Sequence, residues 1–244
     1  MNHRSRRLLQ LGSIVLAAGL AIALVVVLTG GDGGAKKAAD PSAPVAQAAE
    51  VETMLAGIAQ DGIALGRRDA PVTLVEFADL KCPICREYSL SVLPDLVQRY
   101  VRAGKLRIEL RLQHFVGEQQ NPGDSLAAAK MAQAAALQDK LWQFSELFYA
   151  NQQDEATRYA DDAFVSRIAS AVKGLNEEKA LHDRSSPKVT AALATADAQF
   201  EGNGFDGTPS FLLGRTGTTL KPLQVRSLTP QSFATEIDRA LGAA

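Results

Sequence analysis

The most constraining feature of the sequence is a pair of cysteines three positions apart, in Cys82-Pro83-Ile84-Cys85. They are the only cysteines among the 244 residues, so neither has a third cysteine of the chain as a disulfide partner. Residues three apart on a helix lie on the same face, so the two sulfur atoms can meet. Any redox chemistry of this chain must therefore use this pair together with a partner molecule.

The motif lies between the end of an expected strand and the start of an expected helix. Residues 72–78 are a near-continuous apolar run rich in β-branched side chains, which is typical of a strand buried on both faces. From Cys85 to Tyr100, apolar residues recur every three or four positions, which predicts a helix. Pro94 is expected to kink this helix, because proline lacks a backbone donor and clashes with the preceding turn. Cys82 is thereby placed at the helix N-terminus.

This position predicts different roles for the two thiols. Free backbone N–H groups and the helix dipole stabilise an anion, so the pKa of Cys82 should be lowered and its reactive thiolate favoured. Pro83 suits the first helical position, since it has no donor to satisfy. Lys81 is expected to add positive charge beside the motif. Cys85, one turn deeper, should be more buried and less acidic, and is therefore the expected resolving thiol.

The rest of the chain predicts further strands around a helical segment. We expect a small hairpin at Asp61-Gly62 and a strand over 106–115, which would complete a right-handed βαβ unit. The region 124–200 has mostly helical patterns, and two strands (210–213 and 220–225) and a final helix from Thr229-Pro230 follow. The expected helix caps in the helical region are Asp124 or Ser125, Asp161, and Ser186 with Pro187.

The N-terminal segment indicates membrane insertion. Arg4, Arg6 and Arg7 precede an apolar run over 8–28, which is about the length that crosses a bilayer. The run lacks a convincing cleavage pattern, which favours an uncleaved signal anchor over a cleaved signal peptide. The positive-inside rule then places the rest of the chain outside the cytoplasm, where disulfides persist. We therefore expect a cytoplasmic tail (1–7), a transmembrane anchor (8–29) and a flexible linker (30–55).

Other uses of the cysteine pair remain open at this point. A zinc site needs about four ligands, and the chain offers only His3, His114 and His182 as further nitrogen donors. A short structural disulfide and a copper-binding thiolate pair are also compatible with the spacing. The mixed charges, with a net charge of −1, argue against a nucleic-acid partner. We expect a monomer, because no long heptad pattern is present.

Several motifs together resemble the thioredoxin-like fold in its DsbA-like branch. They are Glu76-Phe77 before the cysteines, the helical insert, and the late Gly207-Thr208-Pro209-Ser210-Phe211. The resemblance covers about residues 57–243. It implies an α/β fold with a thioredoxin-like mixed sheet flanked by helices and preceded by one transmembrane helix. The first part of this domain would span 56–122, an all-helical insert 123–200, and the second part 201–244.

The resemblance also implies roles for three residues outside the cysteine pair. Thr208 and Pro209 resemble the cis-proline loop, which lies against the active-site disulfide and offers backbone groups to an extended substrate peptide. Without the cysteines, the same residues would read as an ordinary turn. Glu76 matches the acid buried beneath the motif, where burial raises its pKa and lets it exchange protons with Cys85. The alternative is a carboxylate exposed at the strand end.

The leading hypothesis is a disulfide oxidase that donates the Cys82–Cys85 disulfide to exported cysteine-containing proteins. No metal and no cofactor other than this disulfide are expected, and a quinone-linked membrane partner similar to DsbB or VKOR would reoxidise the pair. The alternatives are a reductase or isomerase of exported thiols, and a membrane-tethered binding or metal-carrying module with a non-catalytic motif. Pro83-Ile84 departs from the Pro-His of the strongly oxidising archetype, and no proline follows Phe115.

Overall fold

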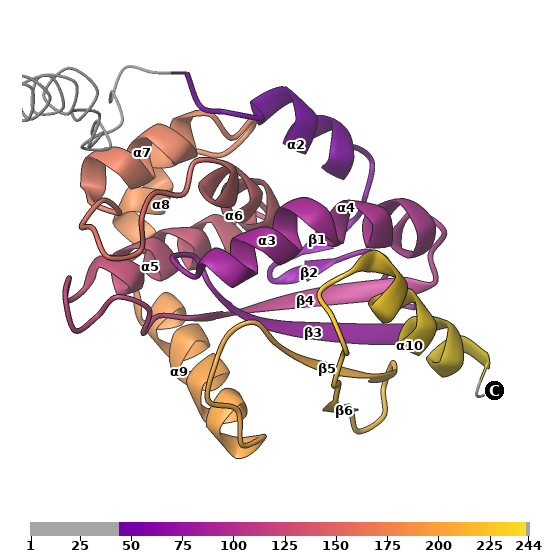
Figure 1. The fold of residues 1–244 in the computed structure, drawn as a ribbon. Coiled ribbons are helices and arrows are strands. Elements are labelled where there is room, and N and C mark those ends of the chain that lie inside the picture. The colour runs from indigo at the N-terminus through magenta and orange to yellow at the C-terminus, as the bar shows by residue number, and fades with distance from the viewer. Residues whose placement is uncertain (1–43, 243–244) are drawn as a thin grey trace, which may run out of the picture. The chain divides into compact units, whose positions relative to one another are not determined.

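The computed structural model describes residues 44–242 and shows one mixed sheet flanked by helices (Figure 1). The expected cytoplasmic tail, the transmembrane anchor and most of the expected linker lie outside these residues. Within 44–242, no helix has the length and apolar character needed to span a bilayer. The α/β architecture with a mixed sheet flanked by helices, expected from the sequence, is confirmed for this part of the chain.

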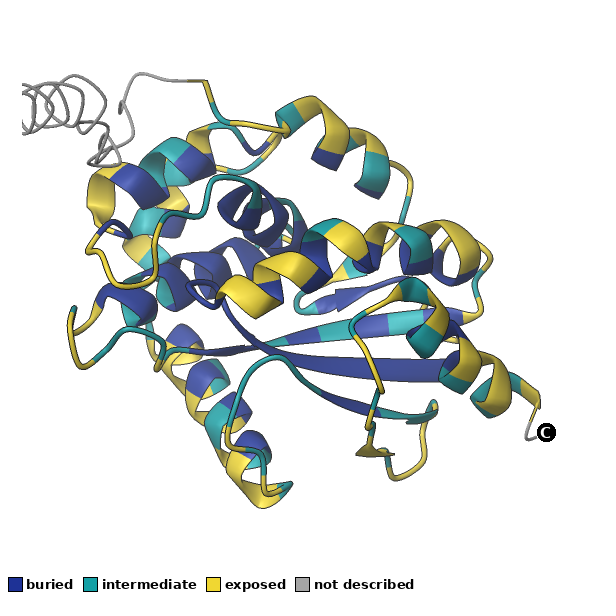
Figure 2. Ribbon diagram, in the orientation of Figure 1, coloured by how far each residue is buried: buried dark blue, intermediate teal, exposed yellow. Residues whose placement is uncertain are grey.

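The strand β3 lies in the middle of the sheet, whose order is β1-β2-β4-β3-β5-β6. It pairs with β4 in parallel and with β5 in antiparallel orientation. All of its residues are buried (Figure 2), as the apolar run predicts. The expected small hairpin is present as the β1–β2 pair, and the expected strand over 220–225 is shortened to two residues. The strands are β1 Gln60–Asp61, β2 Ala64–Leu65, β3 Val72–Asp79, β4 Leu106–Gln113, β5 Ser210–Arg215 and β6 Lys221–Pro222.

Alternation along β3 divides the core into two clusters. Leu74 and Ala78 belong to the larger cluster, which includes side chains of the helix that carries the cysteines. Val75 and Phe77 belong to a smaller cluster on the opposite face, with Phe200. Since successive side chains of a strand point to opposite faces, Glu76 lies on the face of Leu74 and Ala78. This places its carboxyl under the cysteine helix.

The helix that follows the cysteines is broken where the sequence predicts a kink. α3 (Pro83–Ser91) ends at Val92, and α4 (Leu93–Leu96) continues into a π-helical turn, η1 (Val97–Val101). Pro94 lies in the first turn of α4, where its missing N–H leaves no bond unsatisfied. The proline therefore starts a new helical segment rather than interrupting a continuous one.

The helical insert consists of five helices, and two of its three expected caps are confirmed. Asp161 accepts a hydrogen bond from the Phe164 N–H, and Ser186 accepts one from the Val189 N–H. The expected cap at Asp124 or Ser125 is wrong, because Gly123 precedes the first helix and both polar side chains turn into the core. The helices are α5 Asp124–Ala136, α6 Leu141–Ala150, α7 Asp162–Ser170, α8 Glu177–Asp183 and α9 Pro187–Gly202.

Two further helices complete the described chain. α10 (Pro230–Gly242) begins at the expected Thr229-Pro230 and packs near β5 and α4 (Figure 1). The flexible linker expected up to residue 55 is wrong at its end, because α2 (Ala48–Leu55) is helical. Its Val51 and Leu55 are buried against the domain, and α2 packs near α6. The apolar side chains spaced four apart on α2 give it a packing face that the linker composition obscured.

Candidate active site

Cys82 occupies the N-cap of α3, as the sequence predicts. Its backbone is extended, with φ −71° and ψ 121°, and its sulfur accepts a hydrogen bond from the Cys85 N–H at 3.4 Å. Pro83 lies in the first turn of the helix. The cap geometry therefore aims a backbone donor of the first turn directly at the sulfur, which favours the thiolate.

The two thiols differ sharply in burial and acidity. Cys82 is 5% exposed, whereas Cys85 is completely buried, and both are free thiols in this structure. A hydrogen bond from the Cys85 side chain, with help from the backbone N–H groups of Ile84 and Cys85, lowers the pKa of Cys82 to about 6. Burial, followed by the interaction with Cys82, raises the pKa of Cys85 well above its usual value. At neutral pH the outer sulfur is thus a thiolate and the inner one a thiol.

A loop from the far end of the sequence closes over the outer sulfur. The Thr208–Pro209 peptide bond is cis, and the Thr208 carbonyl oxygen lies 3.3 Å from the Cys82 sulfur, which can donate a hydrogen bond to it when protonated. The loop leads directly into β5, and the antiparallel pairing of β5 with β3 carries it to the cysteine end of β3. The sheet register therefore brings together Thr208, Pro209 and Cys82.

A groove runs beside this loop and beside the residue between the cysteines. It has a volume of about 540 Å³, and Ile84 on its rim is 49% exposed. It is lined by residues of the cis-proline loop and by residues of the segment after β6. The lining residues used below are Ile84, Phe205, Thr208, Pro209, Leu223 and Val225.

Glu76 is buried beneath the motif, and the alternative of an exposed carboxylate at the strand end is wrong. The residue is 2% exposed and lies between Leu110 of β4 and Phe211 of β5 in the sheet register. Burial is the main cause that raises its pKa well above the usual value, and the charges of Glu146 and Cys82 add to it. A buried acid of raised pKa can hold a proton at neutral pH.

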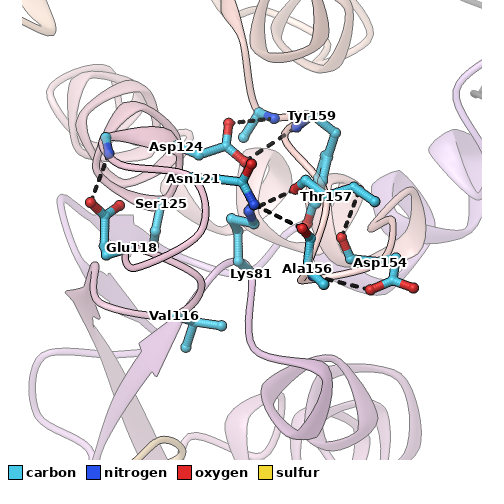
Figure 3. Close-up of polar contacts among 12 residues, drawn as sticks. Lys81, Val116, Glu118, Asn121, Asp124, Ser125, Asp154, Ala156, Thr157 and Tyr159 are labelled. Atoms are coloured by element: carbon cyan, nitrogen blue, oxygen red, sulfur yellow. Dashed lines mark hydrogen bonds and ion pairs between the residues drawn. The ribbon is translucent and has the colours of Figure 1, made fainter.

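Lys81 does not add charge to Cys82, contrary to expectation. Its side chain is completely buried and points into the helical insert, where Nζ lies 2.6 Å from the Asp124 carboxylate and 3.0 Å from the Thr157 carbonyl (Figure 3). Tyr159 lies under the ammonium, 5.0 Å from ring centroid to Nζ. The positive charge is therefore neutralised within the core, and the low pKa of Cys82 has another origin.

Two residues of the site were not predicted from the sequence: one lies on α6 and the other just after it. The Gln152 amide donates hydrogen bonds to the carbonyls of Leu80 and Cys82, at 2.8 and 3.0 Å, and so holds the turn that carries the motif. Glu146 is 3% exposed, and burial raises its pKa to about 8. Its position among the apolar residues of 141–148 was the available signal, because an acid on an apolar helix face has to be buried.

Of the three histidines considered as metal ligands, His3 lies outside the described residues, and His114 and His182 lie beside carboxylates instead of the cysteines. His114 Nε2 faces the Asp197 carboxylate at 3.3 Å, and His182 faces Asp183 on α8. Residues 44–242 contain no group of three or more side chains arranged to hold a metal ion. The residues that do surround the cysteines are a carboxyl, a carbonyl and backbone N–H groups, which suit proton and thiolate chemistry.

Comparison with known proteins agrees with this geometry. Residues 59–228 match the thioredoxin family. A thioredoxin-like oxidoreductase from Silicibacter pomeroyi is 31% identical with a TM-score of 0.57, over 74% of this chain and 92% of the other. The probable disulfide bond formation protein D of Bacillus cereus is 29% identical over 147 residues, which are 60% of this chain and 67% of that relative.

A solved structure of lower sequence identity shows the same fold. BdbD from Bacillus subtilis, in its oxidised form, superposes with a TM-score of 0.64 at 18% identity, over 75% of this chain and 94% of that one. The family match extends from the β1 hairpin to the segment before α10 and contains every site residue described above. The chain therefore belongs to the thioredoxin family and is a thiol–disulfide oxidoreductase.

Proposed function

We propose that this protein is an extracytoplasmic disulfide oxidase that donates the Cys82–Cys85 disulfide to exported proteins. The observation that supports this best is the hydrogen bond to the Cys82 sulfur. It stabilises the thiolate of the reduced form, whose pKa is about 6. A reduced form that is stabilised in this way makes the disulfide a stronger oxidant. The disulfide bond formation protein among its relatives supports the same direction of electron flow.

In the proposed reaction, a client thiolate attacks the Cys82 sulfur and the Cys82–Cys85 bond breaks. The leaving sulfur of Cys85 takes a proton from Glu76, since burial disfavours a thiolate there. A second client thiolate then attacks the client sulfur of the mixed disulfide, and Cys82 leaves as a thiolate. The client gains one disulfide, and the enzyme is left as the dithiol.

The groove beside the cis-proline loop is the proposed peptide site. It lies between Ile84 and the segment around Leu223 and Val225, so it flanks the outer sulfur. Backbone groups of Thr208 are proposed to pair with an extended client segment, in the manner of an added strand. Such main-chain recognition would accept many sequences, which suits an enzyme with varied clients.

Membrane attachment and reoxidation complete the proposal. Residues 8–29 would anchor the domain on the outer side of the membrane, close to a quinone-linked partner similar to DsbB or VKOR that reoxidises the pair. The enzyme is proposed to act as a monomer. The sequence pattern of residues 1–28 supports this arrangement.

The reduction potential of the pair tests the direction of electron flow. We expect a value nearer the roughly −120 mV of DsbA than the roughly −270 mV of thioredoxin. Equilibration with glutathione buffers, with the dithiol fraction read by alkylation and mass spectrometry, gives the potential. A value as low as that of thioredoxin would show a reductase instead.

A trapping experiment tests for clients. Cys85→Ser leaves Cys82 able to attack but removes the resolving thiol, so mixed disulfides with clients should accumulate in cells. Cys82→Ser is the matched control, because it removes the attacking sulfur and should trap far less. If no adduct accumulates with Cys85→Ser, the binding or metal-carrying alternative is favoured over redox exchange.

A further inference from the structure

Two buried carboxyl groups from different elements lie close to the disulfide motif. Glu76 on β3 is 2% exposed and Glu146 on α6 is 3% exposed. α6, which carries Glu146, packs against α3, the helix that lies over Glu76. After burial, the charge of Glu146 is the largest cause of the raised pKa of Glu76. Glu76 alone is enough to exchange a proton with Cys85, so this exchange leaves Glu146 without a role.

Glu146 connects this interior to the surface. Its carboxylate accepts a hydrogen bond from the Ser89 hydroxyl of α3 at 2.6 Å. Both residues line a pocket of about 180 Å³ between α2 and α3, and the exposed side chains of Gln47 and Glu50 line the same pocket. Glu146 thus has one side toward Glu76 and another toward a solvent-accessible pocket with a polar rim.

A buried hydroxyl lies within reach of both charges. Tyr88 is completely buried, and its hydroxyl has no hydrogen-bond partner among residues 44–242. After burial, the charges of Glu76 and Glu146 are the causes that raise its pKa. Its ring packs against Phe211 and Phe233, with centroids 5.0 and 5.2 Å apart. The hydroxyl therefore makes no hydrogen bond to either acid, although the charges of both act on it.

We propose that Glu146 is a proton-relay residue, which passes protons between Glu76 and solvent in the pocket beneath α2. It touches no reacting sulfur and acts through Glu76, so it is a positioning residue for the proton and not a catalytic residue. The inference rests on thiol–disulfide exchange at Cys82 and Cys85, in either direction. The other titratable groups around this route are Tyr88 and Tyr149, the two cysteines, and Glu50 at the pocket rim.

Each proton transfer in the relay follows from the breaking or forming of the Cys82–Cys85 bond. When a thiolate attacks Cys82, the Cys82–Cys85 bond breaks and its electron pair stays on the Cys85 sulfur. Cys85 takes the proton of Glu76, Glu76 takes that of Glu146, and Glu146 is reprotonated from solvent in the pocket. When the pair is reoxidised, Cys85 loses its proton and the same transfers run in reverse. The relay therefore returns Glu76 to its starting state without opening the buried sulfur to water.

The pH dependence of exchange in the Glu146→Gln protein tests the relay. Glutamine keeps the size of the side chain and accepts the Ser89 hydrogen bond, but it cannot carry a proton. Reduction of the full-length oxidised protein by dithiothreitol is followed by stopped flow from pH 5 to 9, with the rate divided by the thiolate concentration. The wild type should show an inflection near pH 8. Glu146→Gln should remove it and slow the reaction below pH 8 by about 10-fold, a part of what acid–base catalysis typically contributes.

Two further variants make the outcome decisive. Glu178→Gln changes an exposed acid on α8 and should leave both the rate and the inflection at the wild-type values. Ser89→Ala removes the donor that stabilises the Glu146 carboxylate, so the inflection should move to higher pH. A pH profile of Glu146→Gln that matches the wild type overturns the relay. If the glutamine variant does not fold, an inflection that stays at the wild-type pH in Ser89→Ala overturns it instead. A wild-type protein that does not react with dithiothreitol would contradict thiol exchange itself.

Discussion

Lys81 and Asp124 form a buried ion pair that ties the turn before the motif to the first helix of the insert. Nζ lies 2.6 Å from the carboxylate, and the two side chains are 0% and 2% exposed. The other carboxylate oxygen accepts the Ala160 N–H, and the network extends to Thr157 (Figure 3). The pair therefore joins residues 81, 124 and 157–160, which the chain order keeps far apart.

Asp124→Asn should destabilise the protein strongly. The change leaves the Lys81 ammonium buried without its counter-charge, and breaking a buried pair in this way typically costs about 3–5 kcal/mol. The free energy of unfolding from urea titration measures the effect. Glu52→Gln is the control, because Glu52 pairs with Lys173 on the surface, at 45% and 80% exposure. Exposed pairs contribute about 0–1 kcal/mol, so equal losses in both variants would contradict the assignment.

Alkylation of Cys82 should follow a titration near pH 6. Only the thiolate reacts with iodoacetamide, and hydrogen bonds lower the pKa of this thiol to about 6. The rate on the dithiol protein should therefore rise from pH 4 to a plateau above pH 7, with half of the maximum near pH 6. Peptide mapping by mass spectrometry assigns the site, and Cys85 should stay unmodified over this range because its pKa is raised. A half-maximum near pH 9 would show an unactivated thiol.

Glu146→Gln should be more stable than the wild type, by an amount that grows as the pH rises. The folded pKa of about 8 lies above the ordinary value of 4.5, so the unfolded state binds fewer protons than the folded state between these values. The wild type consequently loses stability from pH 4.5 to about 8, and the variant does not pay this cost. The difference in unfolding free energy should be near zero at pH 4 and on the order of a few kcal/mol at pH 8. A constant difference across this range would contradict a buried, protonated acid.

Gln152→Ala should loosen the motif and lower the overall stability moderately. Two hydrogen bonds to the carbonyls of Leu80 and Cys82 are removed, at about 0.5–1.5 kcal/mol each. We expect faster amide hydrogen exchange over residues 80–86 and a slower reaction with thiols. Gln153→Ala, at the neighbouring position, is the matched control and should leave exchange over the same residues unchanged. Equal amide hydrogen exchange over residues 80–86 in the two variants would show that Gln152 does not hold the motif.

Local patterns predicted the elements that carry the site. The apolar run of 72–78 predicted β3, and the change to helical spacing after Cys82 predicted α3 and the N-cap thiol. Cap residues predicted the starts of α7 and α9, where Asp161 and Ser186 bond to their own first turns. These features depend on contacts within a few residues, which a sequence displays directly. Glu76 also belongs here, because an acid inside an apolar strand has few places other than the core.

Long-range partners were decided by the tertiary structure alone. Lys81 was expected to act on Cys82, and Asp124 to cap α5, yet each is satisfied by the other across 43 positions of sequence. Gln152 and Glu146 reach the motif only because α6 packs along α3. A side-chain charge or amide takes the partner that folding brings within about 3 Å, and sequence spacing does not specify that partner. The sequence by itself thus determined the sulfur pair, its strand and its helix, and the packing of the insert determined which polar groups surround them.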